Sequence, residues 1–156
     1  MTGDRLAAED REAIHDVKAR YFRLLDTKQW DEWGEVFTVD AVMDMPEAEL
    51  YAEGREAIVT TVREILADVV TVHHGHMGEL EAAGPDAATG IWAMEDYLIW
   101  PPRPDLRSFA RTTRGYGHYF ERYSRADGSW RIARTQLSRL HVETVQQYRA
   151  VTGGGR

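Results

Sequence analysis

The chain has 156 residues, a net charge of −7 and a sequence pI near 5.3, with 43% hydrophobic and 29% charged residues. This length and composition favour a single globular domain. The acidic balance argues against nucleic acid and against an anionic membrane as partners. The absence of cysteine excludes disulfides and thiol chemistry. With neither a signal peptide nor an apolar run of membrane-spanning length, the sequence predicts a cytoplasmic protein.

The first third of the chain has helical periodicity. Apolar residues recur at steps of three and four over residues 8–26, which predicts an amphipathic helix with Tyr21 on its apolar face. Asp10 is the one polar residue in that series, and Lys18 falls among the charged residues of the opposite face. A second helix is expected at residues 30–37, a short strand at 42–45, and a third helix at 54–66.

From residue 69 onward the pattern alternates as in strands. It predicts four long strands, at residues 69–82, 88–100, 111–124 and 130–142, separated by turn signals at Gly84-Pro85-Asp86, Pro101–Pro104 and Asp127-Gly128. Strands of this length must coil, so three helices can close the concave side and leave an apolar pocket. The predicted fold class is therefore α+β, with three N-terminal helices packed on a strongly curved, mostly antiparallel mixed sheet. One domain spans 1–156, and its ends at 1–7 and 151–156 are expected to fray.

Three of the six histidines lie within four residues: His73, His74 and His76. Histidine titrates near working pH and can act as a general base, so one of them facing the pocket is a candidate catalytic group. Alternation puts His73 on one face with Gly75 and Met77, and His74 and His76 on the other. His74-x-His76 also has zinc-ligand spacing, with Glu95 or His118 as a third ligand, but no second metal motif supports it. We expect no metal and no cofactor.

Two later strands carry polar groups beside large apolar ones. Asp96 shares a face with Trp92, Met94 and Leu98, where a carboxylate is costly unless it is paired. Around Gly115, alternation gives two sets, either of which can line a pocket. Tyr116, His118 and Phe120 form one set, and Gly117, Tyr119 and Glu121 form the other.

Several motifs, spread from about residue 9 to residue 142, resemble those of SnoaL-like proteins of the NTF2-like superfamily. They are Tyr21-x-x-Leu24-Leu25-Asp26 with Trp30-Asp31 and Phe37, Gly54 to Ile58, Thr71-x-His73 with Gly75-His76-Met77, Trp92 to Tyr97, Gly115 to Tyr119, and Trp130 to Ile132. The branch that they resemble most is the one that holds scytalone dehydratase and the bile-acid 7α-dehydratase. The resemblance implies the cone-shaped NTF2-like fold.

By motif position, the resemblance also implies site residues. In that branch a tyrosine and an aspartate come from the first helix, a histidine from the Thr-x-His strand and a further aspartate from the next strand. These fall on Tyr21, Asp26, His73 and Asp96 as catalytic candidates. An arginine from the last strand falls on Arg139, with Arg134 as the alternative. The further substrate-binding candidates are His74, Trp92, Tyr116, His118 and Tyr119.

The sequence thus predicts a cofactor-independent lyase of dehydratase type, or a cyclase or isomerase, acting on a hydrophobic polycyclic or polyketide-like small molecule. His73 or His74 is the expected general base, oriented by Asp26. The alternative is a non-catalytic NTF2-like protein that binds a ligand or serves as the small subunit of an oxygenase. Exposed aromatic residues on the back of the sheet favour a homo-oligomer, dimer or trimer.

Overall fold

The computed structural model describes residues 5–103 and 108–148, and these form three α-helices, one 3₁₀ helix and six strands. The helices are α1 (Ala8–Asp26), α2 (Trp30–Gly34), η1 (Pro46–Ala48) and α3 (Arg55–Leu66). The strands are β1 (Phe37–Met45), β2 (Leu50–Glu53), β3 (Val70–Gly84), β4 (Ala87–Trp100), β5 (Ser108–Ser124) and β6 (Arg131–Tyr148). The predicted α+β class is confirmed.

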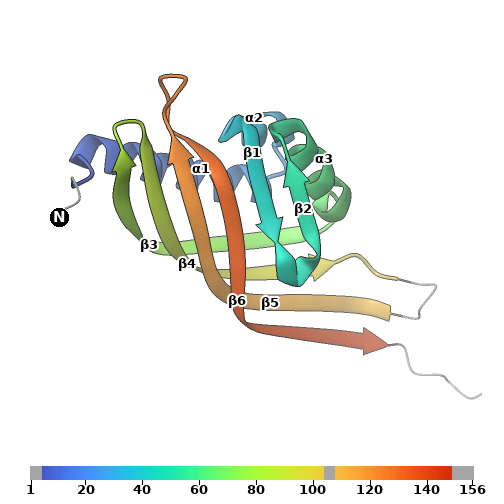
Figure 1. Cartoon of the computed structure of the whole chain (residues 1–156). Helices are drawn as coiled ribbons and strands as arrows, with labels where there is room; N and C mark the ends of the chain where they lie inside the picture. Colours follow the sequence, from blue (N-terminus) through green and yellow to red (C-terminus); the bar gives the residue numbers. More distant parts are fainter. Residues whose placement is uncertain (1–4, 104–107, 149–156) are drawn as a thin grey trace, which may run out of the picture.

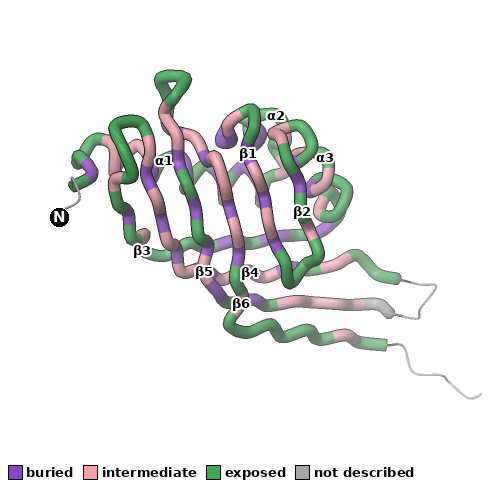
Figure 2. The backbone as a smooth tube through the Cα atoms, viewed as in Figure 1, coloured by how far each residue is buried: buried purple, intermediate pink, exposed green. Residues whose placement is uncertain are grey.

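All six strands join one sheet in the order β2-β1-β6-β5-β4-β3. Neighbouring strands are antiparallel except β1 and β6, which pair in parallel, so the mostly antiparallel mixed sheet is confirmed. Figure 1 shows β3 to β6 bending strongly, with the helices on one side of the sheet. The ends of β4, β5 and β6 continue past the helices, and the last part of β6 is mainly exposed (Figure 2). Within the described ranges, no helix has the length and apolar character needed to cross a bilayer.

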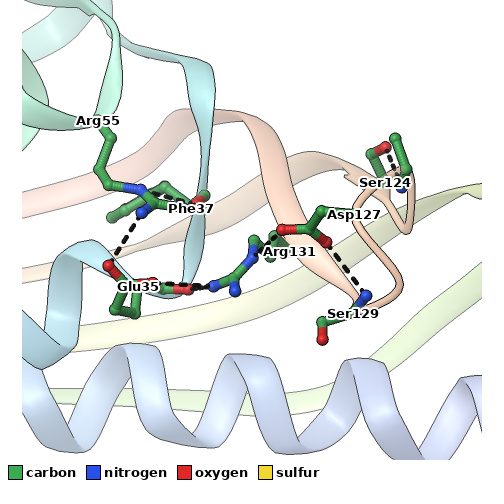
Figure 3. Close-up of polar contacts among 8 residues, drawn as sticks. Glu35, Phe37, Arg55, Ser124, Asp127, Ser129 and Arg131 are labelled. Carbon is green, nitrogen blue, oxygen red and sulfur yellow. Dashed lines mark hydrogen bonds and ion pairs between the residues drawn. The ribbon is translucent and has the colours of Figure 1, made fainter.

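The second helix is shorter than predicted. It ends at Gly34, because Phe37 already pairs with Ile132 of β6 and begins β1. Side chains hold this junction in place (Figure 3): the Glu35 carboxylate accepts hydrogen bonds from Arg55 at 2.9 Å and Arg131 at 3.4 Å, and Arg55 Nε also donates to the Phe37 carbonyl at 3.1 Å. Arg131 in turn bonds Asp127 of the β5–β6 hairpin at 2.7 Å. Long-range strand pairing therefore overrides the helical pattern of residues 35–37.

Two polar residues of α1 are placed by tertiary contacts. Asp10, the break in the apolar series, accepts hydrogen bonds from Trp130 Nε1 at 2.8 Å and Arg125 at 2.5 Å. Lys18, which we expected on the solvent face, is only 1% exposed. Leu6, expected in a frayed end, is buried in the core. Of the other residues expected to fray at the termini, Arg5 and Ala7 are exposed, whereas 1–4 and 151–156 lie outside the described residues, as does Pro104 between β4 and β5.

Candidate active site

A cavity of about 290 Å³ lies between the helices and the inner face of the sheet. Most of its lining is apolar, from α1, β1, α3, β4 and β6. The polar groups that reach it are Tyr21, Glu47, His73, Asp96, Tyr119 and Arg139. An apolar cavity with a few convergent polar groups is the usual form of a small-molecule site.

Asp26 and His73 form a close pair at this cavity. Asp26 is the last residue of α1, and His73 is a buried residue of β3. Asp26 Oδ1 lies 2.7 Å from His73 Nδ1, while Oδ2 accepts the His73 backbone N–H at 2.8 Å. A carboxylate on Nδ1 holds the proton on that nitrogen, which leaves the lone pair on Nε2. The pair therefore has the arrangement of an oriented general base.

Two further residues extend this pair. Thr71 Oγ1 donates to Asp26 Oδ1 at 2.8 Å, and Lys28 Nζ donates to Thr71 Oγ1 at 2.8 Å. Sequence reasoning assigned neither residue to the site. The alternation of β3 places Thr71 on the same face as His73, which is a usable signal for Thr71. Lys28 lies in the turn after α1, and only the fold brings it to β3.

The ring of His73 is also fixed from its side. The Phe22 ring stacks on it with 6.5 Å between centroids and 16° between planes. Gly75 makes room for Phe22, because a Cβ at Gly75 would lie 2.8 Å from Phe22 Cζ and closer still to Cε2. Beyond Gly75 the strand bulges, so Met77 is 93% exposed and does not share the face of His73 as alternation predicted.

Asp96 is the cross-strand partner of His73 in the β3–β4 register. Arg139 binds it with two hydrogen bonds, from Nη1 to Oδ1 at 3.0 Å and from Nη2 to Oδ2 at 2.7 Å. Burial lowers the pKa of Arg139, and the hydrogen bonds and charge of Asp96 raise it by more, so the net shift is upward. The alternative arginine, Arg134, instead pairs with Asp44 at 3.0 Å and does not line this cavity.

Tyr21 and Tyr119 supply two phenols at the same cavity. Their rings lie 5.9 Å apart edge to face. Burial raises the pKa of Tyr21, with the nearby Tyr119 adding to the shift, and burial and the charge of Asp96 raise that of Tyr119. Both groups therefore stay protonated and can donate hydrogen bonds at working pH.

Beneath these phenols lies the buried Lys18. Its Nζ is 3.7 Å from the Tyr119 ring centroid and bonds Glu121 at 2.7 Å. Glu121 also accepts a hydrogen bond from Thr135 at 2.9 Å. Desolvation lowers the pKa of Lys18, while the charge of Glu121 opposes that shift.

A family model described as a SnoaL-like domain matches residues 6–136 of this sequence. The chain belongs to the SnoaL-like domain family. Its described fold, with three helices packed on a six-stranded mixed sheet, is the NTF2-like fold that the motifs predicted.

Solved structures agree with this SnoaL-like fold. A putative aromatic ring hydroxylase from Novosphingobium aromaticivorans superimposes with a TM-score of 0.78 at 23% identity, over 92% of this chain and 96% of that one. A putative scytalone dehydratase from the same organism gives 0.75 at 22% identity, over 95% of both chains. A hexachlorocyclohexane dehydrochlorinase, LinA type 2, gives 0.77 at 19% identity, over 93% and 95%. At these identities the likeness establishes the fold alone.

A curated relative is much longer than this SnoaL-like chain. The ECF RNA polymerase sigma factor SigG of Mycobacterium tuberculosis is 34% identical over 61 residues. The match covers 39% of this chain and 16% of the sigma factor.

The SnoaL-like fold places four of the predicted site residues away from the cavity. His74, Tyr116 and His118 lie on the outer face of the sheet, where His74 Nδ1 is 3.5 Å from a Glu95 oxygen and Tyr116 stacks on His141. None of the three lines the cavity of His73, because strand alternation turns them away from it. Trp92 faces inward, but it is buried in the core and donates to the Tyr123 hydroxyl at 2.9 Å.

The remaining predictions for the SnoaL-like site concern the faces of the strands. The inward set on β5 is the one with Tyr119, and Asp96 faces inward on β4 with Met94 and Leu98 as predicted. Among residues 5–103 and 108–148, no group of three His, Asp or Glu side chains is placed to hold a metal, including the zinc group considered around His74.

Proposed function

We propose that this protein is a cofactor-independent lyase of dehydratase type, acting on a hydrophobic polycyclic or polyketide-like molecule that carries a hydroxyl beside an activated C–H bond. The observation that carries the proposal is the Asp26–His73 pair at the wall of a mostly apolar cavity. The same first step, removal of a proton from carbon, also begins a cyclisation or an isomerisation. Two of the structures with this fold bear names of eliminating enzymes, a dehydratase and a dehydrochlorinase, which supports elimination.

The proposed reaction begins at Nε2 of His73. This nitrogen takes the proton from a carbon next to a carbonyl, and the carboxylate of Asp26 stabilises the imidazolium that forms. The C–H electron pair becomes the new C=C bond as the C–O bond breaks. The departing hydroxide takes the proton back from the His73 imidazolium and leaves as water, which restores the neutral base. Tyr21 and Tyr119, both protonated, donate hydrogen bonds to the carbonyl oxygen or the leaving oxygen.

Arg139 has a supporting role in the proposal. Asp96 occupies two of its N–H donors, and the guanidinium has five. A remaining donor can bind an oxygen of the substrate within the cavity that Arg139 lines. Because Asp96 already neutralises its charge, we expect the preferred substrates to be neutral ketones rather than carboxylates.

The test compares His73→Ala with His74→Ala on a panel of fused-ring β-hydroxy ketones, following the absorbance of the conjugated enone. His74 is the matched control, since it is the next residue of the same strand but faces outward. We expect His73→Ala to lose roughly 10²- to 10⁴-fold in kcat, the usual contribution of a general base, and His74→Ala to keep near-normal turnover.

Full turnover by His73→Ala would remove the base assignment. If the wild-type chain binds panel members tightly but converts none, the non-catalytic ligand-binding alternative takes its place. Binding is measured by quenching of tryptophan fluorescence, with Trp100 on the cavity wall as the reporter.

A further inference from the structure

Lys28 adopts an unusual backbone conformation beside the candidate site. It lies in the turn after α1 with φ of 59°, in the left-handed region that side chains other than glycine and asparagine adopt at a cost. A glycine is the common residue at such a helix end. Strained backbone of this kind persists where the surroundings hold it, and it clusters at functional sites. The positive φ of Lys28 therefore indicates that its side chain has a role that a glycine could not fill.

The side chain of Lys28 reaches the candidate site through Thr71. Lys28 Nζ is half-buried and donates to Thr71 Oγ1 at 2.8 Å, and that oxygen donates to Asp26 Oδ1 at 2.8 Å. Burial lowers the pKa of Lys28, with the charge of Asp26 acting against the shift. The ammonium is thus partly withdrawn from water and directed at a threonine that touches the Asp26–His73 pair.

We propose that Lys28, acting through the Thr71 hydroxyl, is a positioning residue that holds the Asp26 carboxylate against His73 Nδ1 and thereby fixes the tautomer of His73. Its importance for catalysis rests on the proposed function, whereas its effect on the tautomer does not.

The direction of each hydrogen bond from Lys28 to Asp26 follows from the number of donors that each group has. An ammonium has only donors, so Thr71 Oγ1 must accept from Lys28. The hydroxyl has a single hydrogen, which must then go to Asp26 Oδ1. Asp26 accepts at both oxygens, from Thr71 and His73 Nδ1 at Oδ1 and from the His73 backbone at Oδ2. His73 therefore keeps its proton on Nδ1 and its lone pair on Nε2.

Without the ammonium, only the Asp26 carboxylate directs the hydrogen of the Thr71 hydroxyl. The Thr71 hydroxyl becomes free to rotate and can point its hydrogen elsewhere, so Asp26 loses one of its donors. With one donor fewer, the Asp26 carboxylate is held less firmly against His73 Nδ1, so the imidazole proton spends more of its time on Nε2. The base that Nε2 provides is present for a smaller fraction of the time.

The experiment is a long-range ¹H–¹⁵N correlation spectrum of the histidine rings in the ligand-free full chain, with His73 assigned by its loss in His73→Asn. We expect wild-type His73 as one tautomer with the proton on Nδ1. Lys28→Met and Lys28→Gly should each give a second tautomer, and Lys28→Arg, which keeps charged donors, should restore the single one. Thr71→Val should match Lys28→Met, and Thr71→Ser should resemble the wild type.

Melting temperatures separate positioning from a purely structural role. Lys28→Gly removes the cost of positive φ, so its melting temperature should equal or exceed that of the wild type. A changed tautomer in a chain that melts no lower is the outcome that supports the proposal. If Lys28→Met and Lys28→Gly leave the ring spectrum of His73 unchanged, or if Lys28→Arg fails to restore it, the proposal is overturned. If the tautomer changes but Lys28→Gly also melts below the wild type, Lys28 acts by stabilising the end of α1. That outcome overturns the proposal as well.

The enone assay keeps the two hypotheses apart. If the wild type converts no ketone while the tautomer responds to Lys28 as expected, the proposed function fails and the positioning role remains. If the wild type is active and the Lys28 variants match it in both kcat and spectrum, only the positioning role fails.

Discussion

Replacing Arg139 with glutamine removes the partner of a nearly inaccessible carboxylate. The side chain of Asp96 is 1% exposed and that of Arg139 is 20% exposed, and two hydrogen bonds of 3.0 Å and 2.7 Å join them. In Arg139→Gln the charge of Asp96 stays buried without a cation, which costs about 3–5 kcal/mol. In Asp96→Asn the guanidinium can turn toward the cavity, so the cost is about 1–3 kcal/mol. Arg139→Gln should therefore lower the free energy of unfolding more than Asp96→Asn does.

The assay is thermal unfolding followed by circular dichroism. For a chain of this length, 1 kcal/mol corresponds to roughly 2–4 °C, so Arg139→Gln should lower the melting temperature by about 6–20 °C. The double variant Asp96→Asn/Arg139→Gln should melt above Arg139→Gln, because it leaves no unpaired charge. Arg134→Gln is the control on the same strand, since its pair with Asp44 is 39% and 26% exposed and should contribute under about 1 kcal/mol.

Three outcomes would refute this reasoning. The first is that Asp96→Asn destabilises the chain as much as Arg139→Gln does. The second is that the double variant is the least stable of the three. The third is that Arg134→Gln lowers the free energy of unfolding as much as Arg139→Gln does. Each would mean that desolvation of the buried carboxylate does not dominate the energetics of this pair.

Further perturbations test other parts of the cavity wall. Gly75→Ala should displace the Phe22 ring, cost about 1–3 kcal/mol by overpacking and reduce turnover, as read from near-ultraviolet circular dichroism and the enone assay. Lys18→Met leaves a buried carboxylate without its cation and should cost about 3–5 kcal/mol in urea unfolding, and a milder loss would contradict the buried pair. Burial raises the pKa of Tyr21 and Tyr119 above that of an unfolded tyrosine, near 10, so the folded state holds protons that the unfolded state releases. Their contribution to stability is complete below that pH and is lost as pH rises above it, so melting temperatures constant from pH 9 to 11.5 would contradict the burial.

The order of helices and strands could be predicted from the sequence, because local periodicity carries it. The first helix, residues 8–26, is confirmed at both ends, and the four long strands are each found within a few residues, except that β6 continues to Tyr148 instead of ending at Val142. Period-two alternation also specified that Asp96 shares a face with Met94 and Leu98. The motifs that resemble SnoaL-like proteins were sufficient to select His73 and Asp26 as a pair, and the two side chains do meet.

The tertiary structure alone decided which face of each strand looks inward and which distant residues meet there. Alternation sorts His73 from His74 and Tyr119 from Tyr116, but both faces of these strands carry aromatic or titratable residues, so composition gives no preference. The inward face of each strand is the one that the helices cover. The parallel pairing of β1 with β6 and the contact of Lys28 with Thr71 join segments far apart in the chain, for which a local pattern holds no information.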